Sequence, residues 1–81
     1  MVKVQLLYTD RCTRCPAVKE MFRDLQKQFN FDYEEIDALS ERGQEIVSKH
    51  NIMSVPTILI NGEVVFNGVP TREKIITEIM K

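Results

Sequence analysis

Apolar and polar residues follow two different patterns in the first third of the chain. Residues Val2 to Tyr8 are rich in strand formers and end in the turn-like pair Thr9-Asp10, which predicts a first β-strand. After Cys15 the apolar residues recur every three to four positions, as on one face of a helix, at Val18, Met21, Phe22, Leu25 and Phe29. Pro16 suits the first turn of such a helix, where no backbone N–H is required.

The middle of the chain predicts an edge strand and a second helix. Phe31 to Asp37 alternates only weakly and is rich in acidic residues, which is typical of a strand at the edge of a sheet. Ser40 is a favourable N-cap for a helix that ends near His50-Asn51. The residues of this helix expected to face inward are Ile46 and Val47. Gly43 lowers the helix propensity of the segment and is the residue that argues against it.

Two short strands and a last helix complete the chain. Thr57 to Ile60 is an apolar run of the kind that is buried on both faces. The Asn61-Gly62 pair that follows is a strong hairpin signal and leads into a strand from Glu63 to Asn67. Thr71 can cap a terminal helix. The residues of that helix expected to cover the sheet are Ile75, Ile76, Ile79 and Met80.

These elements follow the order β-α-β-α-β-β-α. Such an order predicts an α/β fold with a four-stranded mixed sheet and helices on both faces. A chain of 81 residues has room for one hydrophobic core, so we expect residues 1–81 to form a single domain.

Charge and composition narrow the possible partners. The 11 Lys and Arg residues nearly balance the 12 Asp and Glu residues, so no large basic field is available to hold nucleic acid or an acidic membrane. Nothing in the sequence approaches a membrane span, and Met1 to Tyr8 lacks the long apolar stretch of a signal peptide. We therefore expect a cytoplasmic protein that binds neither nucleic acid nor membranes. The sequence leaves the oligomeric state open, and a monomer is the default expectation.

Two cysteines stand three residues apart where the first strand gives way to the first helix. Cys12 lies at or just before the first helical turn, where free N–H groups and the positive end of the helix dipole favour a thiolate. Arg11 and Arg14 add positive charge in the same direction, although an exposed Arg14 is as often only a solubilising charge. Cys12 is therefore the predicted nucleophile, and Cys15, one turn deeper, is its enclosed partner.

This arrangement predicts thiol–disulfide exchange. Cys12 would attack a substrate disulfide, and Cys15 would resolve the mixed disulfide, leaving the two cysteines oxidised. Neither step needs a cofactor or a metal. In a reducing compartment a close pair of cysteines is more often catalytic or metal-binding than structural.

The strand-Cys-x-x-Cys-helix start and the later segment Ser54-Val55-Pro56-Thr57 together resemble the thioredoxin and glutaredoxin superfamily. The resemblance spans essentially the whole chain, whose size is most similar to the small glutaredoxin-like thioredoxins of archaea and bacteria. It implies the thioredoxin fold, with a cis Val55–Pro56 bond beside the cysteines and the Val55 backbone paired with an extended protein substrate. It also implies that the turn at Gly68 borders the substrate groove. Met53, near Val55 in sequence, either packs in the core or at the rim or faces the substrate.

Several positions depart from the superfamily's patterns. Leu6 stands where thioredoxins carry a buried Asp, so no proton acceptor is assigned for Cys15. Thr13-Arg14 replaces the Gly-Pro of thioredoxins and the Pro-Tyr of glutaredoxins. Gly68-Val69-Pro70-Thr71 replaces the Gly-Gly-acidic turn of glutaredoxins. Pro70 has no backbone N–H that could donate a hydrogen bond to a glutathione carboxylate. We therefore expect electrons from a thioredoxin-reductase-like flavoprotein rather than from glutathione.

Two other functions stay open. The first is a glutathione-dependent glutaredoxin, in which Arg11 or Arg72 would supply a cation. The second is a Cys-x-x-Cys metal-binding carrier module, to which only His50 could add a histidine ligand. The carrier's β-α-β-β-α-β order conflicts with the predicted second helix and late hairpin. Asp10 is interpreted as a turn residue, with acceptance of a proton from Cys12 as the alternative.

Overall fold

Seven elements make up the computed structural model, which describes all residues, 1–81. They are β1 (Lys3–Tyr8), α1 (Cys15–Gln26), β2 (Asp32–Asp37), α2 (Glu41–His50), β3 (Thr57–Ile60), β4 (Glu63–Asn67) and α3 (Arg72–Ile79). The strands form one sheet in the order β2-β1-β3-β4, with β1 and β2 parallel and the other two neighbouring pairs antiparallel. The predicted element order and the mixed sheet are confirmed.

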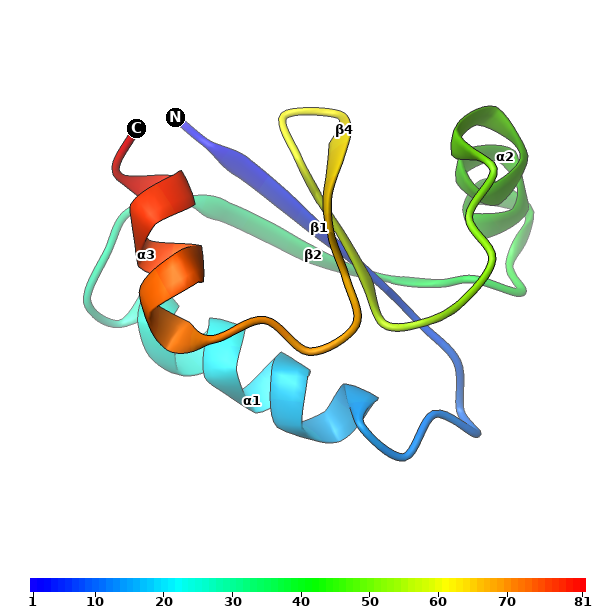
Figure 1. Cartoon of the computed structure of the whole chain (residues 1–81), viewed down its shortest axis with the longest axis horizontal. Helices are drawn as coiled ribbons and strands as arrows, with labels where there is room; N and C mark the ends of the chain where they lie inside the picture. Colours follow the sequence, from blue (N-terminus) through cyan, green and yellow to red (C-terminus); the bar gives the residue numbers. More distant parts are fainter.

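Helices cover both faces of the sheet, as Figure 1 shows. Successive side chains of a strand point to opposite faces, so Leu6 and Leu7 of β1 enter different parts of the core. Leu6 lies on the side of α1 and α3, in a cluster with Val4, Val18, Phe22, Leu25, Phe31, Ile58, Ile60, Ile75 and Ile79. Leu7 lies on the side of α2, in a smaller cluster with Ile36, Ala38 and Leu59. Ile46 and Val47 of α2 pack against this smaller cluster, as predicted.

Two helix ends differ from the prediction. Helix α1 ends at Gln26, and the next backbone N–H groups turn back to the carbonyls of Asp24 and Leu25, so Phe29 packs against the core from the following loop. Helix α3 ends at Ile79, and Met80 is 67% exposed instead of covering the sheet. Both errors arise because an apolar period can continue past the residue at which the backbone leaves the helix.

Gly43 is required where it stands, although it lowers helix propensity. The Ser40 side chain caps α2 by accepting the Gly43 N–H at 3.0 Å. This places the first turn of α2 directly on the loop after β2. A Cβ on Gly43 would overlap the Asp37 carbonyl oxygen and lie 2.8 Å from Ala38 Cα. Glycine therefore permits the close approach of α2 to this loop.

The Asn61-Gly62 hairpin is also confirmed. Asn61 and Gly62 have φ values of 52° and 84°, the left-handed pair that a two-residue hairpin turn needs. The hairpin joins β3 to β4, and the pairing shifts between Ile58 and Leu59. None of the helices combines the length and the apolar character needed to cross a membrane.

Strand β2 is an edge strand, as predicted, and arginines clamp both of its faces. Arg42 of α2 binds both carboxylate oxygens of Glu34, at 2.7 and 2.6 Å. Arg23 of α1 binds Glu35 on the other face, at 3.0 and 2.6 Å. The Arg42 guanidinium, helped by the Gln5 amide, lowers the pKa of Glu34 to about 2. These charged side chains protect the open edge from pairing with another strand.

Candidate active site

Three loops meet at one end of the sheet because of the strand pairing. Leu7, near the end of β1, pairs with Thr57 at the start of β3, and Thr57 pairs with Asn67 at the end of β4. The loop after β1, the loop before β3 and the loop after β4 therefore leave the sheet on the same side. Together they carry most of the predicted site residues.

The cysteine pair lies between β1 and α1. Cys12 and Cys15 form a disulfide, with their Cα atoms 5.4 Å apart. Cys15 is the first residue of α1 and is 1% exposed, whereas Cys12 precedes the helix and is half-buried. The Cys15 N–H donates to Cys12 Sγ at 3.1 Å, and the Cys12 N–H donates to the Thr9 carbonyl at 3.2 Å. A helix-terminal N–H directed at Cys12 Sγ favours negative charge on that sulfur.

Two arginines flank Cys12 without any acidic partner. Arg11 and Arg14 are exposed, and Arg14 occupies the N-cap position of α1 without a side-chain cap. No carboxylate lies within 4.0 Å of either guanidinium, in contrast to Arg23 and Arg42. No ion pair therefore neutralises their positive charge.

The loop before β3 contains the cis Val55–Pro56 bond that the resemblance implies. Pro56 is buried and Val55 is half-buried. The Thr57 hydroxyl donates to the Ser54 carbonyl at 2.7 Å, which closes the loop on itself. The Gly68 N–H donates to the Pro56 carbonyl at 2.8 Å, so the Gly68 turn is attached to this loop. Gly68 has a φ of 99°, which favours glycine.

A small cavity lies where the loop before β3 meets α2 and the residues that follow β1 and β2. Its volume is about 220 Å³, and its lining includes Thr9, Ala38, Val47, Ile52 and Val55. Met53 also borders the cavity, and its side chain is 94% exposed. Sequence reasoning missed the contributions of Thr9, Ala38 and Ile52, because no local signal distinguishes a residue that lines a cavity from one in a turn or in the core. The cavity is lined by segments that are distant in sequence, and Thr9, whose carbonyl accepts the Cys12 N–H, links it to the loop that carries the cysteines.

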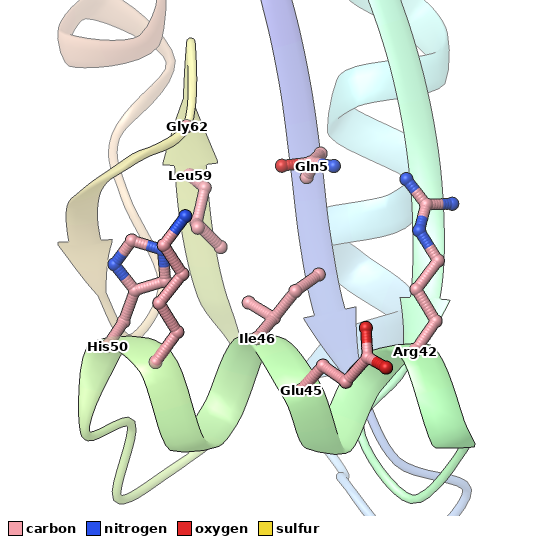
Figure 2. Close-up of a pocket in the computed structure, with 8 residues that line it drawn as sticks. Gln5, Arg42, Glu45, Ile46, His50, Leu59 and Gly62 are labelled. Carbon is pink, nitrogen blue, oxygen red and sulfur yellow. The ribbon is translucent and has the colours of Figure 1, made fainter.

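Three other residues that the sequence singles out, His50, Leu6 and Tyr8, belong to other parts of the structure. His50 ends α2 and lines a separate cavity of about 290 Å³ with Gln5, Arg42 and Gly62, as Figure 2 shows. Leu6 is fully buried in apolar surroundings and offers no proton acceptor. Tyr8, at the end of β1, has Lys19 Nζ 3.5 Å from its ring centroid, a cation–π contact that joins β1 to α1.

The geometry defines a class of protein: thiol–disulfide oxidoreductases that carry a Cys-x-x-Cys pair at the start of the first helix of a thioredoxin fold. A thioredoxin domain family model matches residues 2–81, and the chain belongs to this family. It is 35% identical over 82 residues to thioredoxin from Methanocaldococcus jannaschii, covering 99% of this chain and 94% of that one. The protein is accordingly a protein-disulfide oxidoreductase that acts on disulfide-containing proteins.

Solved structures show the same fold at lower sequence identity. A mutant thioredoxin from Halobacterium salinarum matches with a TM-score of 0.79 and 23% identity, over 96% of this chain and 71% of that one. Thioredoxin 1 from Thermosipho africanus matches with a TM-score of 0.74 and 22% identity, over 96% of this chain and 90% of that one. The observed element order also differs from the β-α-β-β-α-β order of the carrier modules.

Proposed function

We propose that Cys12 is the nucleophile and Cys15 the resolving cysteine of a protein-disulfide reductase. The observation that carries this proposal is the difference in exposure within one disulfide, because only the half-buried Cys12 can meet a protein substrate. The Cys12 thiolate attacks one substrate sulfur, forms a mixed disulfide and releases the other substrate sulfur as a thiolate. Deprotonated Cys15 then attacks Cys12 Sγ, closes the Cys12–Cys15 disulfide and releases the second substrate sulfur. Two electrons pass to the substrate.

The role assignment is tested by alkylating the reduced protein with iodoacetamide. Cys12 should react first, since it combines exposure with the helix N-terminus and with the charges of Arg11 and Arg14. Peptide mapping at partial modification reports the order. Faster labelling of Cys15 would reverse the two roles.

The substrate binds, on this proposal, across the loop before β3. The Val55 backbone pairs with an extended segment of the substrate, and Pro56 holds that loop against the cysteines. Gly68 borders the same groove, supported by its hydrogen bond to the Pro56 carbonyl. Met53 covers the outer rim, where its 94% exposed side chain is available for contact.

Electrons come, we propose, from a flavoprotein disulfide reductase. Two features of the segment just before α3 support this donor over glutathione. Pro70 brings no N–H to the turn before the helix, and Thr71 already accepts the Lys74 N–H at 3.3 Å. Fewer donors are therefore left to bind a glutathione carboxylate at this end of the helix.

The donor is tested by insulin reduction in two arms. One arm contains NADPH and a thioredoxin reductase from the same organism, and the other contains glutathione and glutathione reductase. Turnover in the first arm is the expected result. Rapid turnover with glutathione and none with the flavoprotein would show that the protein acts as a glutaredoxin.

We also propose that the protein works as a cytoplasmic monomer, since a reactive dithiol is kept reduced in that compartment. Gel filtration should give the 9.4 kDa of one chain, and cell fractionation should recover the protein with cytoplasmic markers. A dimer, or recovery with secreted proteins, would contradict this assignment.

A further inference from the structure

The five arginines of the chain fall into two groups. Arg23 and Arg42 each lie 2.6 Å from a glutamate of β2 and serve to hold that strand. Arg11, Arg14 and Arg72 have no carboxylate within 4.0 Å, as no ion pair involves them. Arg11 and Arg14 stand on either side of Cys12, whereas Arg72 begins α3. In Figure 1 the first turn of α3 is well separated from the loop that carries Cys12.

Positively charged side chains outnumber acidic ones in the sequence around Cys12. Asp10 is the one acidic residue of the loop, and it is exposed beside Arg11. No acidic residue follows between residues 11 and 19, and α1 has none in its first turn. Lys19 adds a further cation one turn after Cys15, held over the Tyr8 ring. A substrate that approaches Cys12 therefore meets two unpaired guanidinium groups and a single carboxylate.

We infer that Arg11 and Arg14 select protein disulfides whose attacked cysteine has an acidic neighbour in the substrate sequence. This inference rests on the proposed role of Cys12 as the nucleophile. In the mixed disulfide the substrate cysteine is bonded to Cys12 Sγ, so the residues next to it come within reach of the long side chains on both sides. A substrate carboxylate there forms an ion pair with a free guanidinium. A substrate with a basic neighbour is disfavoured by the same charges.

Exposed ion pairs are weak, so the preference is a matter of rate rather than of all-or-none choice. Each arginine should favour an acidic over a neutral neighbour by about 2- to 5-fold in the second-order rate constant at low salt. The preference should disappear near 1 M salt, where the Debye length is about 3 Å. Asp10 opposes the two arginines, so its removal should increase the preference.

The test uses pre-reduced full-length protein and two self-quenched disulfide peptides that differ only in Asp or Asn beside the attacked cysteine. Fluorescence release gives a rate constant for each, and their ratio cancels any general change in the reactivity of Cys12. The wild type should favour the Asp peptide, and Arg11→Gln with Arg14→Gln should bring the ratio near one. Asp10→Asn should raise the ratio. Arg72→Gln removes one positive charge away from the site, as Arg11→Gln or Arg14→Gln alone would remove one beside Cys12, and should leave the ratio unchanged.

The outcomes distinguish failure of the inferred selectivity from failure of the proposed function. A wild-type ratio near one overturns the inference, and so does a ratio that is unchanged in the double arginine variant. In either case, reduction of both peptides still supports the exchange reaction. If Arg72→Gln lowered the ratio as much as the loss of Arg11 or Arg14, the preference would depend on net charge alone. That result would also overturn the inference. Failure of the wild type to reduce either peptide would overturn the proposed function itself.

Discussion

Replacing Gly43 by alanine tests the packing of α2 against the loop after β2. Helix propensity alone predicts a gain, since glycine inside a helix is about 1 kcal/mol less favourable than alanine. The structure predicts the opposite sign. The new Cβ would lie 2.8 Å from Ala38 Cα and 2.9 Å from the Ala38 carbonyl carbon, so backbone must move to admit it.

The opposing energies decide the direction of the change. Forcing extra volume into a packed site costs about 1–3 kcal/mol. The movement also strains the Ser40 cap, because the Gly43 N–H is its donor, and loss of such a cap costs about 1 kcal/mol. Set against the propensity gain, the net loss in the free energy of unfolding is about 1–3 kcal/mol.

Urea denaturation of the oxidised protein measures this loss. With an m value of about 1 kcal/mol/M, Gly43→Ala should lower the urea midpoint by about 1–3 M. Ser48→Ala, at an exposed position of the same helix, is the matched control and should raise stability by up to about 0.5 kcal/mol. A Gly43→Ala variant as stable as wild type, or more stable, would refute the close approach of helix and loop.

Two further predictions concern stability. The lowered pKa of Glu34 means that its ion pair with Arg42 stabilises the fold above the carboxyl's ordinary pKa of 4.5, and that this contribution is lost as the pH falls toward 2. Urea midpoints measured from pH 6 to 2 should therefore fall more steeply for wild type than for Arg42→Gln, and parallel curves would contradict the pairing. Leu6→Ala, at a fully buried position, should reduce the free energy of unfolding by about 2–5 kcal/mol. A loss below about 1 kcal/mol would show that the site collapses around the change.

Helices and strands were predictable from the sequence where one buried face requires apolar residues at a regular spacing. Val18, Phe22 and Leu25 are spaced as a helix on a sheet requires, and all three are buried. The Asn61-Gly62 pair was equally informative, because both residues must adopt positive φ. Helix ends were less predictable, since Phe29 continues the apolar period after the backbone has left α1.

The site was predictable only in part, and for physical reasons. The cysteine pair is local in sequence, so its place before a helix could be inferred. Gly43 was misleading because its reason for being glycine is the position of Ala38, which only the fold determines. The cavity bordered by Thr9 and Met53 also gathers Val47 and Ile52 from other segments, and each residue alone is typical of ordinary packing.

The most direct test of the account is to trap the mixed disulfide that it requires. Cys15→Ser, incubated with a disulfide-containing protein, should accumulate a covalent adduct through Cys12, because the resolving step alone is lost. Cys12→Ser should form no adduct and reduce no substrate. Non-reducing electrophoresis and mass spectrometry of the adduct identify the linked residue. An adduct through Cys15 in the Cys12→Ser variant, with none through Cys12 in the Cys15→Ser variant, would contradict the assignment of Cys12 as the nucleophile.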